Sequence, residues 1–257
     1  MAGDGRDPAM SLRVLLLAGT LEARHLASAL GAVRGLTVMA SLSGPARTPN
    51  ALGVATRIGG FGGEDGFRDF LDRERIGAVL DATHPFAARI STRSARICGD
   101  LRVPYGLLLR PAWRPQPGDR WHFAQNEADA ARQVPEGATA FLATGRMGLD
   151  AFGTMPGRRV YVRQLDRRPD TPVPFEDGDW VVGRPPFPVE AEAALFRRLG
   201  VAWLVVRNAG GSSSRTKLDA ARKLAIDVAM IRRPPQPESI RFDTVSAAIL
   251  WVRRMIQ

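Results

Sequence analysis

The sequence predicts an α/β protein of two domains, each built on a parallel sheet. Apolar runs of strand length alternate with helical patterns through the first half of the chain. A segment that holds three prolines and a glycine, residues 110–119, then interrupts the alternation, which resumes after it. We therefore expect a disordered leader at 1–11, a first domain at 12–110, a linker at 111–119 and a second domain at 120–257.

The first domain opens with the apolar run Arg13–Ala18, which Gly19 ends. Because helices cover both faces of a parallel sheet, its strands are apolar throughout, and this run predicts one of them. The same patterns predict strands over 36–42, 78–82 and 105–109, and helices over 21–30, 67–76 and 87–99. This alternation predicts right-handed crossovers between parallel strands.

The second half shows the same alternation. Its patterns predict strands near 140–144, 160–164, 180–183, 203–207 and 228–231, and helices near 190–199, 217–225 and 244–255. Ligands of open parallel sheets bind beyond the carboxyl ends of the strands. Two such edges that face each other would form a cleft, so we expect the ligands there.

Composition limits the functions that this chain can have. Its 45% hydrophobic and 24% charged residues are typical of a globular domain. The single cysteine, Cys98, excludes an intramolecular disulfide, and with only three histidines it excludes a Cys/His zinc site. We expect no metal, and a reducing, cytoplasmic location. No apolar run approaches the roughly 18–20 residues of a membrane helix, so we expect no membrane partner.

The net charge of +10 favours an anionic partner. Nucleotide phosphates, a polycarboxylate and nucleic acid all meet that condition. The arginines occur as doublets such as Arg158-Arg159 and Arg253-Arg254, with no longer basic run. A nucleic-acid-binding module is therefore the weaker alternative, and we expect no nucleic-acid partner.

The first candidate ligand site follows the first strand. Gly19 and Thr20 form a turn that opens the next helix, and Leu21 and Arg24 lie in its first turn. A glycine permits close backbone approach, and the N–H groups of a helix start favour a phosphate. One glycine does not make the G-x-G-x-x-G pattern, so phosphate binding and a plain turn capped by Thr20 both remain open.

The end of the second strand indicates which nicotinamide nucleotide would bind. An acidic residue near this position contacts the ribose of NAD, whereas an arginine accommodates the 2′-phosphate of NADP. Residues 41–47 hold no carboxylate and instead offer Ser41, Ser43 and Arg47. We expect NADPH, with these three side chains at its 2′-phosphate, and a solvated loop is the alternative.

Two further motifs lie at predicted strand ends of the first domain. Gly60, Phe61 and Gly62 belong to a glycine-rich stretch whose bare backbone suits a flat ligand, unless it is only a flexible loop. Thr83 and His84 belong to the motif Asp-Ala-Thr-His-Pro-Phe-Ala after a buried strand. We expect both to contact the cofactor, and a structural hydrogen-bonding role is the alternative. His84 is the candidate catalytic residue, because a histidine pKa near 6.5 suits a proton donor.

Cationic, flat and polar groups also follow predicted strands in the linker and the second domain. We expect these to bind the substrate: Arg110, Trp113, Arg146, Asn208, Gly210 and Lys217. Lys217 is unusual because only it and Lys223 are lysines among the 36 basic residues. A cation in the first turn of a helix opposes the helix dipole, which favours an anion-binding role. A structural role is the alternative for each of them.

Taken together, these motifs resemble the precorrin-6A reductase family of cobalamin biosynthesis. The resemblance runs from Leu15 to about Pro234, and its most specific motif is Asp81–Ala87. Two departures stand out: Ala18 where the family usually has glycine, and Arg-Asn-Ala at 207–209 where it has Lys-Asn-Ser. The roles of positions 207 and 209 are therefore open.

The resemblance implies NADPH-dependent reduction of one double bond in precorrin-6A, which gives precorrin-6B. It implies two Rossmann-like domains facing across a cleft, the first for NADPH and the second for the tetrapyrrole. Cobalt-precorrin-6A is the alternative substrate. Acetate and propionate groups edge the macrocycle, and arginine and lysine would bind them. We expect a monomer whose catalysis depends mainly on positioning, with His84, solvent or a substrate carboxylate as proton donor.

Overall fold

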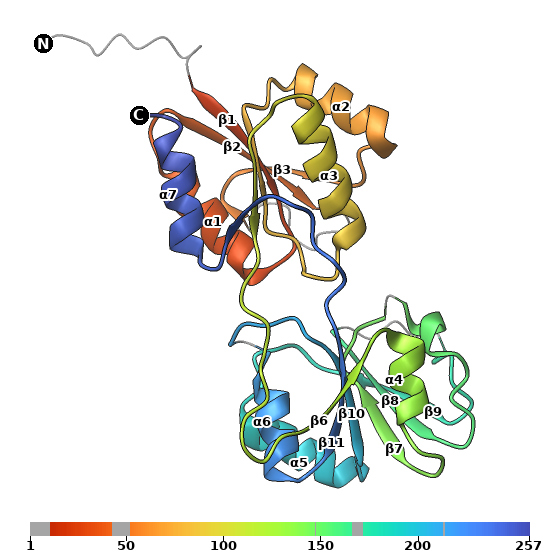
Figure 1. Cartoon of the computed structure of the whole chain (residues 1–257). Helices are drawn as coiled ribbons and strands as arrows, with labels where there is room; N and C mark the ends of the chain where they lie inside the picture. Colours follow the sequence, from red (N-terminus) through yellow and green to blue (C-terminus); the bar gives the residue numbers. More distant parts are fainter. Residues whose placement is uncertain (1–10, 43–51, 147, 166–171, 213) are drawn as a thin grey trace, which may run out of the picture. The chain divides into compact units, whose positions relative to one another are not determined.

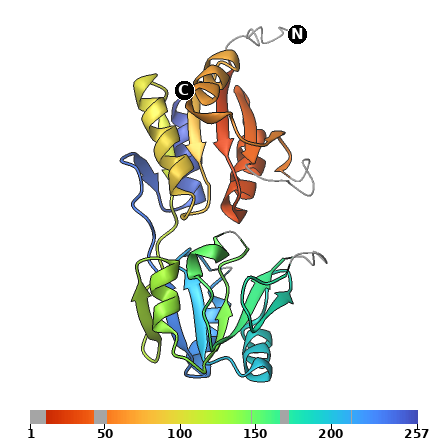
Figure 2. The same ribbon diagram turned by 90° about the vertical axis from the view of Figure 1, so that its right-hand side faces the viewer.

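The computed structural model describes residues 11–42, 52–146, 148–165, 172–212 and 214–257. The chain divides into two compact units, residues 1–110 with 234–257, and residues 111–233. Each unit holds a six-stranded sheet, and the strands pair in parallel throughout (Figure 1 and Figure 2). The predicted α/β fold with two parallel sheets is therefore confirmed, while the predicted cleft stays a prediction.

The first sheet has the strand order β12-β5-β4-β1-β2-β3. Its strands are β1 (Leu12–Leu17), β2 (Leu36–Leu42), β3 (Ala55–Ile58), β4 (Ala78–Asp81), β5 (Tyr105–Leu108) and β12 (Ile240–Phe242). Its helices are α1 (Leu21–Gly31), α2 (Gly63–Arg73), α3 (Ala88–Asp100) and α7 (Val245–Arg254). Helices α1 and α7 cover one face of the sheet, and α2 and α3 cover the other (Figure 1).

Strand β1 contributes to a separate core on each face of this sheet. Val14 and Leu16 pack with residues of α1 and α7, whereas Leu15 and Leu17 pack with residues of α2 and α3. No more than 1% of any of these four residues is exposed. Successive strand residues point to opposite faces, so a strand covered on both sides needs the unbroken apolar run that its sequence shows.

The C-terminal segment belongs to the first unit, so the predicted second domain at 120–257 is wrong in its last part. Strand β12 lies parallel to β5 at the edge of the first sheet, and α7 packs against α1. The ring of Phe242 lies 5.4 Å from that of Trp251. A Cβ at Gly106 would come within 2.6 Å of the Phe242 ring, so the glycine makes room for it. A strand of three residues carries too short a pattern to be predicted.

The predicted linker at 111–119 belongs to the second unit. Its Trp113 is only 7% exposed and lies in the core of that unit. Its Asp119 accepts a hydrogen bond from Nε of Arg222 at 3.0 Å. The chain therefore passes from the first unit to the second at 110–111 and returns to the first at 233–234. The predicted boundary between a linker and a second domain at 119–120 is wrong.

The second sheet has the strand order β6-β11-β10-β7-β8-β9. Its strands are β6 (Arg120–Ala124), β7 (Thr139–Leu142), β8 (Arg159–Gln164), β9 (Gly178–Val182), β10 (Trp203–Arg207) and β11 (Asp227–Ile231). Its helices are α4 (Glu127–Gln133), α5 (Val189–Leu199) and α6 (Thr216–Lys223), with a 3-10 turn η3 (Leu149–Phe152). Among these elements, β6 and α4 were not predicted. Because β6 is a largely exposed strand at the edge of the sheet, its sequence need not be apolar and carries little pattern. No helix in the described ranges is long and apolar enough to span a membrane.

We expect Phe242→Ala to lower the free energy of unfolding of the first unit by roughly 3 kcal/mol, because it leaves a cavity against β5 and α7. Ile240→Ala on the same strand is the matched control, since Ile240 is 52% exposed. Urea unfolding followed by tryptophan fluorescence measures both losses. Equal losses for the two variants would contradict the packing role of Phe242.

Candidate functional site

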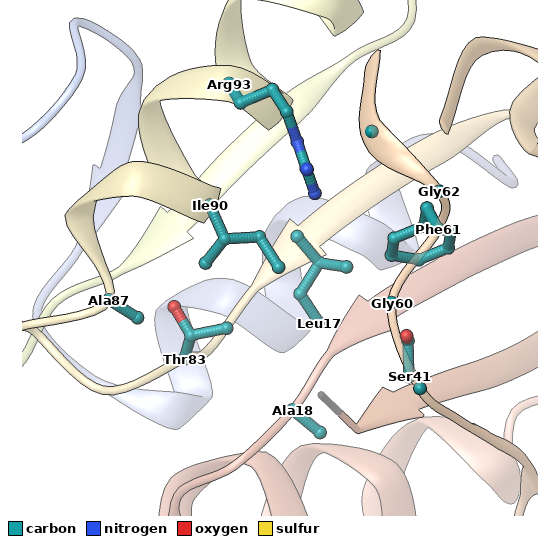
Figure 3. A pocket seen from close by; sticks show the side chains of 12 residues that line it. Leu17, Ala18, Ser41, Gly60, Phe61, Gly62, Thr83, Ala87, Ile90 and Arg93 are labelled. Carbon is teal, nitrogen blue, oxygen red and sulfur yellow. The ribbon is translucent and has the colours of Figure 1, made fainter. Parts of the chain in front are cut away.

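A pocket of about 160 Å³ opens where β1, β2 and β4 end in the first unit (Figure 3). It is lined by Leu17, Ala18, Ser41, Gly59, Gly60, Phe61, Gly62, Gly63, Thr83, Ala87, Ile90 and Arg93. Figure 3 shows Thr83, Ile90 and Arg93 on one side and Ser41, Gly60 and Phe61 on the other. The fold thus brings Ser41, the glycine-rich loop and Thr83, which the sequence analysis placed at separate strand ends, around one cavity.

Thr20 joins the start of α1 to the loop that follows β4. Its hydroxyl accepts the N–H of Ala23 at 3.2 Å, which caps the helix, and donates to the carbonyl of Ala82 at 2.7 Å. Gly19 has φ of +147°, a conformation that side-chain-bearing residues rarely adopt. Leu21 and Arg24 are exposed on α1 and do not line the pocket. Thr20 therefore caps α1, while phosphate binding at this turn stays a prediction.

Arg57 lies beside the pocket and was missed by the sequence analysis. It stands directly opposite Ser41 in the β2–β3 pairing and donates from Nη1 to the Ser41 hydroxyl at 2.8 Å. It also donates to the carbonyls of Gly59 at 2.9 Å and Gly60 at 2.8 Å. Its guanidinium carbon lies 4.0 Å from the centre of the Phe61 ring. Arg57 therefore fixes the glycine-rich loop and puts a positive charge at the end of β2.

The electrostatic surroundings of Arg57 favour an anion. Burial lowers the pKa of its guanidinium, and the nearby charge of Arg73 lowers it further. An anion bound beside it would offset both effects. Ser43 and Arg47, which were predicted to bind a 2′-phosphate, lie outside the described residues. Arg57 escaped prediction because β3, a four-residue edge strand, gave no recognisable pattern.

The glycine-rich loop is held by close packing. Gly62, with φ of +83°, starts α2 in a left-handed conformation. A Cβ at Gly66 would come within 1.9 Å of the carbonyl oxygen of Phe61, so only glycine fits there. The Phe61 ring packs edge-on against Phe67 at 4.8 Å and Phe70 at 5.0 Å. The bare backbone of the loop therefore faces the pocket while its aromatic side chain anchors it.

Arg93 extends from α3 into the pocket and is the second residue that the sequence analysis missed (Figure 3). Its Nε is buried and has no hydrogen-bond partner among the described residues. Its guanidinium carbon lies 5.9 Å from the centre of the Phe67 ring. A buried N–H without a partner is costly, so a ligand oxygen here would be stabilising.

Asp81 organises the loop after β4 from a fully buried position. Its Oδ2 accepts the Tyr105 hydroxyl at 2.7 Å, and its Oδ1 accepts the N–H of Thr83 at 2.9 Å. Burial, followed by the charge of Asp81, raises the pKa of Tyr105 well above its usual range. The same two causes raise the pKa of the Cys98 thiol to about 12. Of the two roles left open for this motif, the contacts of Asp81 fit the structural one.

His84 is exposed and is not among the pocket-lining residues. Its Nδ1 accepts the N–H of Phe86 at 3.3 Å, which places the proton of the neutral ring on Nε2. Its carbonyl accepts the N–H of Ala87 at 2.7 Å. The imidazole thus helps to shape the turn into α3, and Nε2 is the atom that could donate a proton.

Trp113 and Asn208 hold each other in the second unit. Asn208 accepts the backbone N–H of Trp113 at 2.8 Å and donates to its carbonyl at 3.0 Å, and both residues are buried. The indole N–H donates to the carbonyl of Gly211 at 2.6 Å. A Cβ at Gly210 would lie 2.2 Å from the carbonyl oxygen of Pro111. The expected substrate contact of Trp113 does not fit this burial, and its contacts with Asn208 and Gly211 fit the structural alternative.

The other cations predicted to bind substrate have different surroundings. Nη1 of Arg110 lies 2.7 Å from Oε2 of Glu22, so that ion pair holds it in the first unit. The guanidinium of Arg146 lies 5.6 Å from the centre of the Trp180 ring. Lys217 donates to the carbonyl of Ser214 at 2.9 Å, and burial lowers its pKa to about 8.

Comparison with known proteins agrees with these features. A family model for Precorrin-6x reductase CbiJ/CobK matches residues 13–253. Precorrin-6A reductase of Rhodococcus erythropolis is 43% identical over 242 residues, which cover 93% of this chain and 97% of that protein. Cobalt-precorrin-6A reductase of Priestia megaterium is 28% identical over 233 residues, which cover 86% and 90%. The solved structure of CobK precorrin-6A reductase is 36% identical, has a TM-score of 0.87 and covers 95% of this chain and 96% of that one. The chain therefore belongs to the precorrin-6x reductase CbiJ/CobK family.

Proposed function

We propose that this protein reduces one double bond of precorrin-6A with NADPH, which gives precorrin-6B. The observation that carries the proposal is the likeness to precorrin-6A reductases along nearly the whole chain, at 43% identity for the Rhodococcus protein. The lower identity of 28% to the Priestia cobalt-precorrin-6A reductase favours the metal-free substrate. We also propose that the protein works in the cytoplasm.

The pocket of the first unit fits a nicotinamide nucleotide. Its glycine backbone leaves room for a flat group, and the unpartnered Nε of Arg93 can donate to a ligand oxygen. Arg57 of β3 donates to Ser41 at the end of β2. Residues 41–47 hold no carboxylate that would bind the ribose, so this place favours a 2′-phosphate. The start of α1 at Gly19 and Thr20 would hold the pyrophosphate. When bound there, NADPH supplies the hydride of the reduction.

The residues of this chain contribute mainly by positioning. The Thr20 and Asp81 hydrogen bonds hold the loops that form two sides of the pocket, which favours a fixed approach of the two reacting carbons. The reduction also needs one proton. Nε2 of His84, solvent and a substrate carboxylate can each deliver it, and the exposed place of His84 favours a shaping role for that residue.

The second unit would bind the carboxylates that edge the macrocycle. Of the residues predicted to bind the substrate, Arg146 and Lys217 remain the best candidates, because neither forms an ion pair with another described residue. Arginine and lysine both form charge-assisted hydrogen bonds with carboxylates.

The direct test of the function is incubation of the purified protein with precorrin-6A and NADPH. We expect NADPH absorbance to fall and the tetrapyrrole mass to rise by two hydrogens. Parallel incubation with cobalt-precorrin-6A is the comparison that decides between the two substrates. Consumption of NADPH without a gain of two hydrogens would remove the proposed function.

We expect Arg57→Ala to weaken NADPH binding by about 1.5–3 kcal/mol, the range for a hydrogen bond to a charged group, and to leave NADH binding nearly unchanged. Arg73→Ala is the matched control, because it removes a neighbouring charge whose side chain is 66% exposed. Fluorescence titration with both nucleotides measures the effect. Equal loss for NADPH and NADH would mean that Arg57 acts only through the shape of the glycine-rich loop.

We expect His84→Ala to lower kcat less than tenfold and to leave NADPH affinity intact, since positioning carries most of the catalysis. General acid catalysis typically contributes about 10²–10⁴-fold, so the two roles are well separated. Steady-state kinetics with precorrin-6A measures kcat, and nucleotide titration checks binding. A loss above a hundredfold with intact binding would identify His84 as the proton donor.

A further inference from the structure

The second unit contains a group of poorly exposed charged side chains in which positive charges outnumber negative ones. Arg163 and Glu192 form an ion pair, with Nη2 and Oε2 2.7 Å apart. Their side chains are 12% and 2% exposed. Lys217 lies in the first turn of α6, which packs against α5, the helix that carries Glu192 in its own first turn. The charges of Glu192 and Arg163 both affect the pKa of the Lys217 ammonium. Two positive charges therefore lie near one carboxylate in a poorly solvated place.

Three elements bring these residues together at one edge of the second sheet. Arg163 is near the carboxyl end of β8, while Glu192 and Lys217 lie in the first turns of α5 and α6. Helices α5 and α6 pack against each other and lie side by side in Figure 1. Strands β10, β7 and β8 are neighbours in the sheet, so the segments that follow them meet at this edge. Ligands of parallel sheets bind at such an edge.

Polar groups at this edge remain without partners. Nε of Arg163 is buried and makes no hydrogen bond to any described residue. The hydroxyl of Thr144, just after the neighbouring strand β7, is in the same condition. Lys217 has three N–H donors and uses one for the carbonyl of Ser214 at 2.9 Å. Several buried donors and a surplus positive charge suit an anion with more than one oxygen.

We propose that Arg163 and Lys217 together bind one carboxylate of the substrate, and that Glu192 is the positioning residue that holds Arg163 in place. The inference rests on the proposed function and deepens it, since the macrocycle carries acetate and propionate groups. Arg163 receives a role that the sequence analysis did not assign. The Glu192 carboxylate neutralises one of the two positive charges and reduces the repulsion between Arg163 and Lys217. One net positive charge remains for the ligand.

The electrostatics of Lys217 support this arrangement. Burial lowers its pKa to about 8, Glu192 opposes the decrease and Arg163 adds to it. A bound carboxylate would add a second negative charge, so the pKa of Lys217 should rise when the site is occupied. A lysine that only closes its own loop through Ser214 would show no such response to a ligand.

The chain allows this response to be measured directly, because Lys217 and Lys223 are its only lysines. In protein labelled with ¹³C-lysine, the two Cε signals report the two ammonium groups, and Lys223→Arg assigns them. Lys223 is the internal control, since its side chain is 46% exposed and pairs with Glu190. The added probe is tricarballylate, a stable compound with three carboxylates. We expect the Lys217 signal to shift when the probe is added, and the midpoint of its pH titration to rise from about 8. The Lys223 signal should not change.

Kinetics with precorrin-6A provide the second measurement. We expect Lys217→Ala and Arg163→Lys to raise KM at least tenfold with kcat within threefold, and Glu192→Gln to raise KM by a smaller factor. Lys223→Ala is the matched control and should leave both constants unchanged. Lys217→Arg should restore most of the affinity, because it keeps the charge.

The two measurements separate the outcomes. A wild-type protein that does not reduce precorrin-6A would remove the proposed function, while a Lys217 shift with tricarballylate would still support the anion site. An unchanged Lys217 signal with tricarballylate, or an unchanged KM in Lys217→Ala and Arg163→Lys, would overturn the site. Circular dichroism and thermal unfolding of each variant separate a loss of fold from a loss of binding.

Discussion

The parallel pairing of β4, β1 and β2 is the constraint on which the candidate site depends. Leu17 at the end of β1 pairs with Ser41 on one side and with Asp81 on the other. Because the three strands run in the same direction and end level with each other, the segments that follow them arrive at one edge. The Thr20 hydroxyl then ties two of these segments together through the carbonyl of Ala82. The pocket is a consequence of strand register before any of its side chains is considered.

Buried polar groups divide into those that complete the fold and those that it leaves unsatisfied. Asp81 forms hydrogen bonds with Tyr105 and Thr83, and Asn208 forms them with the backbone of Trp113. Nε of Arg93 and Nε of Arg163 are buried without partners in the described structure. Leaving a buried donor unpaired costs free energy, which selection tolerates most readily where a ligand supplies the partner. Arg93 lies in the first unit and Arg163 in the second, each at an edge where a parallel sheet binds ligands.

The local sequence pattern predicted much of the architecture. The apolar run of β1, the helical period of α1 and its Thr20 cap all lie in contiguous residues. The contacts that it missed join residues far apart in the chain. Trp113 stands among prolines in the predicted linker, and nothing nearby in the sequence indicates its contact with Asn208, 95 residues later. Arg57 was not distinguished from the other arginines because its position depends on the pairing of β3 with Ser41. Edge strands such as β3, β6 and β12 have few apolar constraints, so their sequences carry little signal.

Because the chain crosses between the units twice, the two units complete their folding in a fixed order. The second unit is one uninterrupted stretch, 111–233, inserted between β5 and β12 of the first. During synthesis, residues 111–233 leave the ribosome before β12 and α7 do. Until then the first sheet lacks the strand that pairs with β5, and α1 lacks its contacts with α7. Contacts between such distant segments are slow to form because a long loop must close. The unit that contains β1 is therefore completed after the unit that is inserted into it.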